Sequence, residues 1–298
     1  KISVIGAGNV GASAASAILL RGIADEIALV DIFGDVARAK AIDLSQSAAV
    51  FGLDASVAGG DDFELIKDSD IVVVTAGSPR KEGQTREDLL LKNAGIVKGT
   101  VEKIAKFAPN CVIINVTNPL DALTYLVYKT SGFDKSRVLG MAGELDSARL
   151  KYEISQKTGL KNSAFSAHII GSHNDDMVAL QSNVSVDLGG EFDAVAHEAK
   201  TGGAKIVKLL GTSAYYAPGA AAAKMCEAIK TGSEQWLSCC VIEGECAGGR
   251  LVKLGKGGVR EIKQPSAEEK VVLEKSESQT AANIKFLKSR NCSFGIFE

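Results

Sequence analysis

The sequence lacks several features that mark whole classes of protein. No apolar run approaches the roughly 18 residues that a membrane-spanning helix needs. The six cysteines form no Cys-x-x-Cys pair and fit neither a disulfide framework nor a zinc site, which predicts reduced thiols in a cytoplasmic protein. Lys plus Arg (34) and Asp plus Glu (36) nearly cancel, so the basic excess typical of nucleic-acid or anionic-membrane binders is missing.

Proline (5) and aromatic residues (5%) are also scarce, whereas glycine (31) is abundant. This mix favours an α/β enzyme with tight turns over a disordered chain. A chain of 298 residues with 46% hydrophobic residues can bury a full core without disulfides or structural metals. At roughly 150 residues per domain, the length indicates about two domains.

Over the first half of the chain, short apolar runs alternate with helical patterns. The run Ile71–Thr75 is continuous and β-branched, as in a parallel strand that is buried on both faces. We expect strands at 1–5, 26–30, 71–75, 111–116 and 138–141, and helices at 10–20, 36–50, 86–107 and 121–130. The alternation predicts a doubly wound parallel (Rossmann) sheet in a first domain, residues 1–141.

After residue 141 the pattern changes, which predicts a second, α+β domain over residues 142–298. We expect helices at 145–158, 191–210, 219–231 and 266–289. The helix at 191–210 should be interrupted or bent at Gly202-Gly203. We expect strands at 165–171, 236–242 and 250–262, the last two in an antiparallel sheet.

Gly6-Ala7-Gly8-Asn9-Val10-Gly11 fits the pattern G-x-G-x-x-G, and it follows a strand and opens a helix. The first glycine allows a tight turn, the second lets a pyrophosphate approach the backbone, and the third lets helix and strand pack closely. Asp31 ends the next strand, where its carboxylate can bind ribose hydroxyls and repel a 2′-phosphate. The pattern therefore predicts NAD rather than NADP. The alternative is a glycine turn of another α/β protein.

Arg80, Lys81 and Arg86 lie in one loop after the third expected strand. Loops at the carboxyl ends of parallel strands face the ligand crevice, and arginines suit a planar, anionic substrate. An ordinary solvated basic loop explains the same residues equally well.

A His, an Asp and an Arg form a further candidate group. Asp146 and Arg149 share one face of an expected helix, and His173 ends an expected strand in a glycine-rich turn. Taken singly, an ion pair on the surface and a structural histidine are the simpler interpretations. Together they offer a proton carrier, an acid to orient it and a carboxylate binder. A zinc site from the three histidines lacks metal-like spacing, so we expect no metal.

The chain as a whole resembles the malate/lactate dehydrogenase family, most closely its lactate-dehydrogenase-like malate dehydrogenases. Leu145-Asp146-Ser147-Ala148-Arg149 is similar to the family's L-D-x-x-R, and Gly171-Ser172-His173 to its G-x-H-G-D. The other matching segments, in family order and spacing, are Gly6–Gly11, Val30-Asp31, Thr75–Arg86 and Val116–Pro119.

The resemblance implies a role for each of these residues. His173 is the implied catalytic acid/base, and Asp146 is its partner. Arg149 would bind the substrate's C1 carboxylate, and Arg86 would polarise the carbonyl from a closing loop. Asn118 would lie near the substrate hydroxyl and the nicotinamide. Arg80 falls where malate enzymes carry Arg and lactate enzymes typically Gln. The implied cofactor-binding residues are Gly6, Gly8, Asn9, Val10, Gly11, Asp31, Thr75, Ala76, Gly77, Asn93, Val116 and Asn118.

Several positions depart from the family pattern. Asn174 replaces the glycine after the histidine, Glu82 replaces a proline, and Glu144 stands where many relatives are apolar. The segment from Cys246 to Leu254 and the stretch after Leu188 are shorter than in relatives. None of these departures removes a catalytic group.

The implied function is an NAD-dependent malate dehydrogenase of the tricarboxylic acid cycle that interconverts (S)-malate and oxaloacetate. The alternatives are a lactate or other 2-hydroxyacid dehydrogenase and a non-catalytic NAD-binding sensor. We expect a small dicarboxylate as substrate, with neither nucleic acid nor membrane as partner.

The expected helix at 36–50 also bears on assembly, because Ala37, Ala41, Leu44 and Ala48 form one apolar stripe on it. The stripe covers its own sheet or pairs with a second copy, and the pattern alone does not decide. The resemblance implies pairing through this helix in a homotetramer, with a dimer as the simpler alternative.

Overall fold

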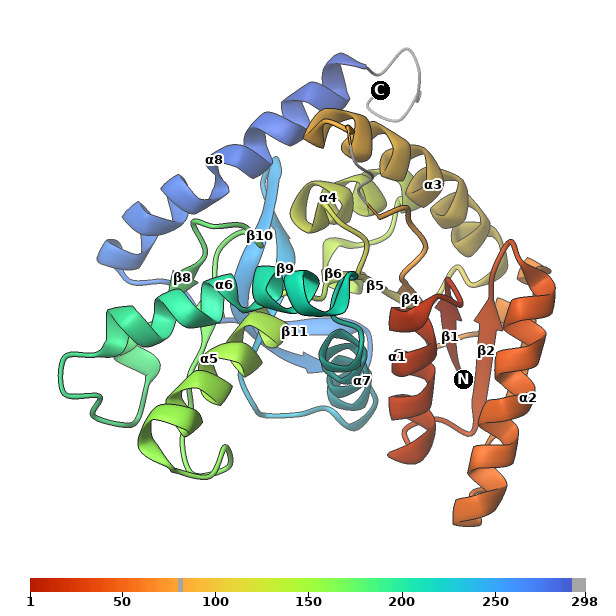
Figure 1. Ribbon diagram of the computed structural model, residues 1–298. Coiled ribbons are helices and arrows are strands. Elements are labelled where there is room, and N and C mark those ends of the chain that lie inside the picture. Colours follow the sequence, from red (N-terminus) through yellow and green to blue (C-terminus); the bar gives the residue numbers. More distant parts are fainter. Residues whose placement is uncertain (80–82, 291–298) are drawn as a thin grey trace.

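The computed structural model describes residues 1–79 and 83–290. Its first half alternates strands and helices (Figure 1). The strands are β1 (Ile2–Ile5), β2 (Glu26–Val30), β3 (Ser56–Gly60), β4 (Ile71–Val74), β5 (Val112–Asn115) and β6 (Val138–Gly140). The α-helices are α1 (Asn9–Leu20), α2 (Gly34–Phe51), α3 (Arg86–Phe107) and α4 (Leu120–Ser131).

The second half continues with mixed elements. Its α-helices are α5 (Gly143–Thr158), α6 (Phe192–Leu210), α7 (Tyr216–Thr231) and α8 (Ala267–Ser289). Its strands are β7 (Ile169–Ile170), β8 (Val178–Ala179), β9 (Leu237–Glu243), β10 (Cys246–Gly255) and β11 (Gly258–Ile262).

One sheet of nine strands runs through both halves, in the order β11-β10-β9-β6-β5-β4-β1-β2-β3. Strands β1 to β6 are parallel in the order 3-2-1-4-5-6 of a doubly wound dinucleotide-binding sheet, which confirms the predicted Rossmann arrangement. The antiparallel strands β9, β10 and β11 extend this sheet at the β6 edge instead of forming a sheet of their own. The predicted domain limit, between residues 141 and 142, falls between β6 and α5.

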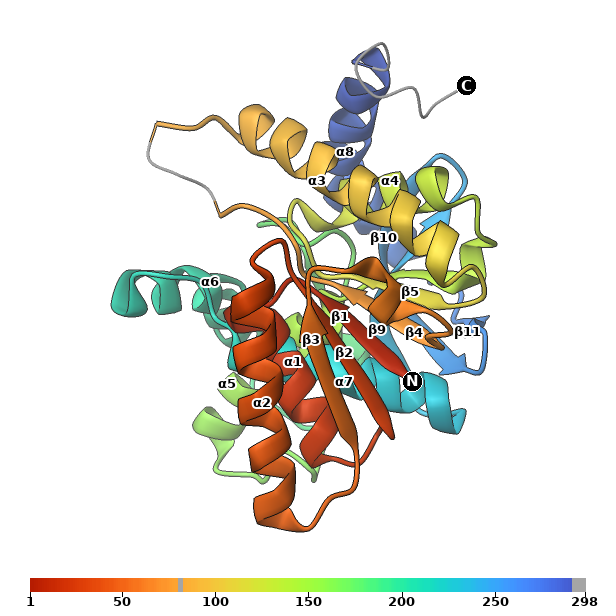
Figure 2. The same ribbon diagram turned by 90° about the vertical axis from the view of Figure 1, so that its right-hand side faces the viewer.

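Helices cover both faces of the sheet (Figures 1 and 2). Buried residues of α1 and α7 form a core on one face, and those of α3, α4 and α8 form a core on the other. The strand β4 is buried along its whole length because it lies between these two layers. The helices α5 and α6 pack on each other around a smaller cluster that includes Leu150, Ile154 and Val195.

Several local expectations were wrong. Strand β3 was missed because its sequence, Ser-Val-Ala-Gly-Gly, is weakly apolar and lies at the sheet edge. The strand expected at 250–262 is two strands, because Gly257 and Gly258 take positive φ angles of 91° and 101° and turn the chain. The strand expected at 165–171 shrinks to two residues, and α6 runs unbroken through Gly202-Gly203.

Glycine turns lie beside the two segments that are shorter than in relatives, the stretch after Leu188 and the segment from Cys246 to Leu254. Glu243 pairs with Cys246, so only Gly244 and Glu245 link β9 to β10, and Gly244 has a φ of +56°. Before α6, Gly189 and Gly190 both take positive φ angles. Glycine thus stands at positions whose positive φ would be strained for a residue with a side chain.

The alanine stripe on α2 covers this chain's own sheet. Ala37 and Ala41 are 0% and 3% exposed, and both lie against Gly59 of β3. A Cβ at Gly59 would lie only 2.2 Å from the Ala37 carbonyl oxygen, so the missing side chain is what lets helix and strand approach. Of the two alternatives for the stripe, the structure therefore favours cover of the chain's own sheet, and pairing of copies through α2 stays a prediction.

Candidate active site

The glycine loop between β1 and α1 has the geometry of a phosphate cradle. Gly6 has a φ of +103°, and a Cβ there would lie 2.6 Å from Thr75 Oγ1. A Cβ at Gly11 would lie 1.8 Å from the Gly6 carbonyl oxygen. A Cβ at Gly8 would meet nothing within 4 Å, so the backbone there is open to a ligand at the start of α1. Two glycines thus serve packing, and the third leaves space for a pyrophosphate.

Asp31 is tied to this loop. Its Oδ2 accepts a hydrogen bond from the Ala7 amide at 2.6 Å, and its Oδ1 accepts one from the Phe33 amide at 2.9 Å. Lys40 of α2, which sequence reasoning missed, donates to the Ala7 carbonyl at 2.6 Å. Both backbone polar groups of Ala7, the N–H and the carbonyl, are therefore held by side chains.

The ends of β4 and β5 are joined to the glycine loop by side chains. Thr75 donates to the Gly6 carbonyl at 3.0 Å, and Thr117 donates to the Ala76 carbonyl at 2.9 Å. The buried amide of Asn93 accepts from the Ser78 amide at 2.8 Å and donates to the Asn118 carbonyl at 2.7 Å. Asn93 therefore positions the loops that follow both strands, a function that its type and spacing did not indicate.

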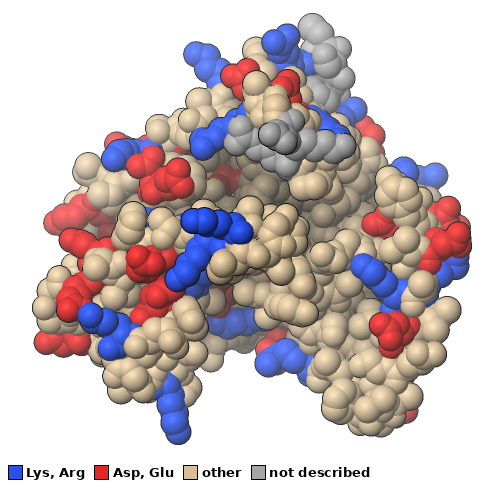
Figure 3. All heavy atoms as spheres, viewed as in Figure 1, with Lys and Arg blue, Asp and Glu red and all other residues tan. Residues whose placement is uncertain are grey.

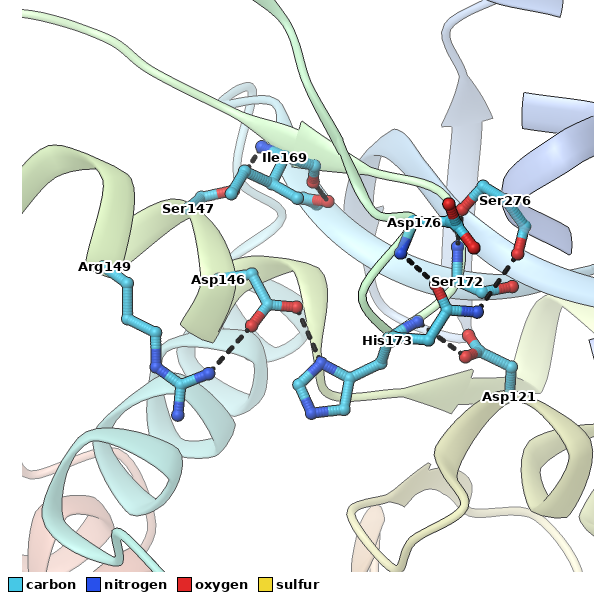
Figure 4. Close-up of polar contacts among 11 residues, drawn as sticks. Asp121, Asp146, Ser147, Arg149, Ile169, Ser172, His173, Asp176 and Ser276 are labelled. Carbon is cyan, nitrogen blue, oxygen red and sulfur yellow. Dashed lines mark hydrogen bonds and ion pairs between the residues drawn. The ribbon is translucent and has the colours of Figure 1, made fainter. Parts of the chain in front are cut away.

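Three of the residues singled out in the sequence meet where α5 faces the turn after β7 (Figure 4). Asp146 Oδ2 lies 2.7 Å from His173 Nδ1, and Asp146 Oδ1 accepts from Arg149 Nη1 at 3.1 Å. Asp146 is 2% exposed. The other ring nitrogen of His173 is left free by these contacts. This arrangement orients an imidazole and keeps a guanidinium beside it.

The charge balance around His173 favours its protonated form. Burial opposes the imidazolium, but the negative charges of Asp146 and Asp121 and the hydrogen bond to Asp146 outweigh it, so the pKa of His173 is raised. The surroundings of His173 therefore stabilise the imidazolium.

Asp121, in the first turn of α4, is a residue of this site that the sequence did not reveal. Its Oδ2 accepts from the backbone amide of His173 at 2.8 Å, and its Oδ1 has no hydrogen-bond partner among the described residues. Burial raises the pKa of Asp121 to about 6, although the amide of His173 acts against the rise. The one signal was an acidic residue in the apolar stretch from Leu120 to Leu126.

Arg149 lies between α5 and α6. A Cβ at Gly203 of α6 would lie 3.2 Å from Arg149 Nη2, so a glycine at this point leaves room for the guanidinium. Asp146 is its only ion-pair partner in the described part of the chain. Donors of the guanidinium therefore remain for a second carboxylate.

Of the two loop arginines, the structure describes only Arg86. Arg86 begins α3 behind a capping box of Thr85 and Asp88; it is exposed, and the structure brings it into contact with neither Asp146 nor His173. Arg80 and Glu82 lie outside the described residues. In the space-filling view, the surface is hollowed between α6 and the part of the molecule that carries α3 and α8 (Figure 3).

Residues 1–79 and 83–290 lack two further features. No helix there is long and apolar enough to cross a membrane. No group of three or more His, Cys, Asp or Glu side chains there is placed to hold a metal ion.

Comparison with known proteins gives matches over nearly the whole chain. Residues 1–140 match the model for the NAD-binding domain of lactate/malate dehydrogenases, and residues 143–290 match the model for their α/β C-terminal domain. A malate dehydrogenase of Nitratiruptor sp. is 45% identical over 277 residues, which cover 88% of this chain and 87% of the relative.

Solved structures are similar to the same extent. The malate dehydrogenase of Salinibacter ruber superposes with a TM-score of 0.91 at 36% identity, over 99% of both chains. A lactate dehydrogenase of Cryptosporidium parvum, solved with lactic acid and nicotinamide adenine dinucleotide, gives 0.90 at 32% identity over 96% of this chain and 97% of the other. The fold is therefore shared by enzymes of both substrates.

Proposed function

The chain belongs to the lactate/malate dehydrogenase family, and on that premise we propose that it is an NAD-dependent malate dehydrogenase. It interconverts (S)-malate and oxaloacetate. The observation that carries the proposal is the buried contact of Asp146 with both His173, at 2.7 Å, and Arg149, at 3.1 Å. A sensor that only binds NAD has no use for a proton carrier beside a carboxylate binder.

In malate oxidation, the free ring nitrogen of neutral His173 takes the proton of the C2 hydroxyl. The carboxylate of Asp146 orients the imidazole and stabilises the imidazolium that forms. The carboxylate is buried between His173 and Arg149, so water screens its charge little. In the reverse direction the imidazolium returns its proton to the carbonyl oxygen of oxaloacetate.

Arg149 binds the carboxylate next to the reacting carbon, with donors that Asp146 does not occupy. Arg80 and Arg86 pair with the distal carboxylate, and Arg86 also stabilises charge that develops on the carbonyl oxygen. Asn118 lies near the substrate hydroxyl. Because Arg86 is exposed at the start of α3, this proposal requires the segment that leads into α3 to close over bound substrate.

The residues present fit NAD. The open backbone at Gly8 and the start of α1 hold the pyrophosphate, together with Asn9 and Val10, and Asp31 binds the adenosine ribose. Thr75, Ala76, Gly77 and Val116 line the edge where β4 and β5 end. Bound at these residues, the oxidised cofactor would supply the acceptor for the hydride from C2 of malate, and NADH the hydride donor for oxaloacetate.

A lactate dehydrogenase is the second candidate, because a lactate enzyme shares the fold at a TM-score of 0.90. Arg80 separates the two candidates: an apolar substrate would leave its charge unpaired in the closed site. The test compares oxaloacetate with pyruvate in NADH oxidation by the wild type. We expect oxaloacetate to have the higher kcat/KM, and a preference for pyruvate would refute the malate assignment.

The variant Arg80→Gln sharpens this test. Loss of one charge-assisted pair should cost oxaloacetate about 2–5 kcal/mol, or roughly 30- to several-thousand-fold in kcat/KM. Pyruvate, which has no distal charge, should be used as well as before or better. Lys92→Gln is a matched control, because Lys92 is a cation of α3 that already bonds to Ser78 Oγ, at 2.8 Å. A fall for oxaloacetate of less than about fivefold would show that Arg80 does not bind the substrate.

We also propose that the enzyme is a homotetramer, or a dimer as the simpler alternative, and that it works in the cytoplasm in the tricarboxylic acid cycle. Exposed apolar residues of α2 support assembly, since Ile42, Val50 and Phe51 are 59%, 80% and 66% exposed. The cytoplasmic location is supported by the five described cysteines, all of which are free thiols.

A further inference from the structure

Four consecutive residues, Gly171 to Asn174, include the catalytic histidine, and each is held by a different contact. Gly171 exchanges two backbone hydrogen bonds with Gly249 of β10, at 2.9 and 2.8 Å. The amide of Ser172 donates to Ser276 Oγ of α8 at 3.0 Å, and the amide of His173 donates to Asp121 of α4. The turn at the site is thus fixed by β10, α8 and α4, each of which lies far from it in sequence.

Asn174 supplies the fourth contact, at the position where relatives carry glycine. Its Nδ2 donates to the carbonyl of Ser276 at 3.1 Å, while its Oδ1 accepts from the amide of Asp176 at 2.9 Å. Ser276 thus contacts both the residue before His173 and the residue after it. A glycine at position 174 would give the turn but could not reach α8.

The partner surface on α8 is buried and rigidly placed. Ser276 is 1% exposed, and Thr280, one turn further on, hydrogen-bonds to Ser172 Oγ at 2.8 Å. The next residue, Glu277, is paired with Arg250 of β10. Figure 4 shows Ser276 and Ser172 on the far side of His173 from Asp146. A buried hydrogen-bonded contact of this kind fixes geometry rather than adding much stability.

We propose that Asn174 and Ser276 form a clamp that positions His173 against Asp146, so that Asn174 is a positioning residue for the proton transfer. The part of this inference that concerns catalysis rests on the proposed function. The clamp acts through the backbone of His173 and touches neither substrate nor cofactor.

The charged groups that act on the imidazole are Asp146 and Arg149 of α5 and Asp121 of α4. Without the clamp, the turn gains freedom and the contact with Asp146 weakens. The pKa of His173 then moves back toward its ordinary value, which is downward. A change that merely loosened the fold elsewhere would leave this pKa where it is.

The experiment uses the full chain and two readouts. NMR titration follows the imidazole of His173, which is one of only three histidines in the chain and is assigned by its loss in His173→Gln. We expect Asn174→Ala and Ser276→Ala each to lower the pKa of His173 by about 0.5 unit. We expect kcat with oxaloacetate to fall about 2- to 10-fold, the effect of one lost neutral hydrogen bond, with the KM for NADH unchanged.

Two further variants sharpen the result. Ser278→Ala removes an exposed hydroxyl of the same helix, which donates to the Lys275 carbonyl of its own helix at 2.8 Å, and should leave both readouts unchanged. Asn174→Ser keeps an acceptor for the Asp176 amide but cannot reach α8, so it should behave like Asn174→Ala. If Asn174→Ser behaves like the wild type, the contact with α8 is not what matters, and the clamp is refuted.

The two proposals fail in different ways. A wild type that does not reduce oxaloacetate refutes the proposed function, but the titration still supports the clamp if the pKa of His173 falls in both alanine variants. An unchanged pKa in both folded variants refutes the clamp even when the wild type turns oxaloacetate over.

Discussion

Replacing Asp146 by asparagine tests the central step of the proposed mechanism. The carboxylate is 2% exposed, and its Oδ2 lies 2.7 Å from His173 Nδ1. Asp146→Asn keeps the shape of the side chain but removes the charge that stabilises the imidazolium. Burial, which opposes the charged imidazole, then acts with less compensation, so the pKa of His173 must fall.

The size of this fall follows from the lost contact. A hydrogen bond to a charged group contributes roughly 1.5–3 kcal/mol, and one pKa unit corresponds to about 1.36 kcal/mol. The pKa of His173 should therefore fall by about one to two units. Oxaloacetate reduction needs the imidazolium, so its kcat/KM well above the original pKa should fall about 10- to 100-fold from this cause alone. The new amide also offers an N–H to Nδ1, which favours the wrong tautomer and lowers the rate further.

The assay is the pH profile of kcat/KM for oxaloacetate with NADH in excess. Asp176→Asn is the matched control, because it removes an exposed carboxylate from the same turn, one whose ion pair within the described residues is with Lys275, at 3.5 Å. An Asp146→Asn profile whose inflection stays within about 0.3 unit of the wild type would refute the reasoning. NADH affinity, followed by fluorescence, should be unchanged in both variants.

Apart from the edge strand β3, the parallel half of the fold was predictable because its signals are local. A strand buried on both faces, such as β4 (Ile-Val-Val-Val), reads as a continuous β-branched run. The second half was predicted less well because its decisive features are not local. That β9 pairs with β6, through Gly140 and Cys240, depends on residues a hundred positions apart, and no pattern in either segment announces it.

The alanine stripe of α2 shows where a pattern is ambiguous in principle. A small apolar face suits close packing on a strand as well as on another helix. What decided the matter was Gly59, a residue of an edge strand that the sequence did not reveal. The larger, exposed apolar residues of the same helix were present in the sequence but gave no regular stripe.

At the site, the residues that carry chemistry were predictable and the residues that hold them were not. His173, Asp146 and Arg149 stand in motifs whose residue types state their chemistry. Asp121 contributes by accepting a backbone amide 52 positions away, and Asn93 by bonding to two loop backbones. A side chain can bond to the backbone of any type of residue. The sequence therefore shows no matching residue type from which such a contact could be inferred.

Three further predictions concern cofactor choice, acid stability and assembly. Asp31→Ser removes the carboxylate that would repel a 2′-phosphate, so the ratio of kcat/KM for NADH over NADPH should fall by about tenfold or more; an unchanged ratio would place the selectivity elsewhere. Burial, aided by nearby lysines, lowers the pKa of His168 from 6.5 to about 4, so the folded chain resists a protonation that the unfolded chain undergoes. The free energy of unfolding therefore falls by up to about 3 kcal/mol as the pH falls from 6.5 to about 4. In His168→Gln, the free energy measured by urea unfolding should depend less on pH over this interval. On α2, Ile42 is 59% exposed, whereas its neighbour Ala41 is 3% exposed and lies against β3. Ala41→Glu buries a charge on the sheet and should destabilise the subunit itself, whereas Ile42→Glu should separate subunits and leave their circular dichroism unchanged, because a two-fold axis brings the new charge against its own copy. A wild type that light scattering measures as a 31.1 kDa monomer at micromolar concentration, or an Ile42→Glu variant that stays assembled, would contradict an interface through α2.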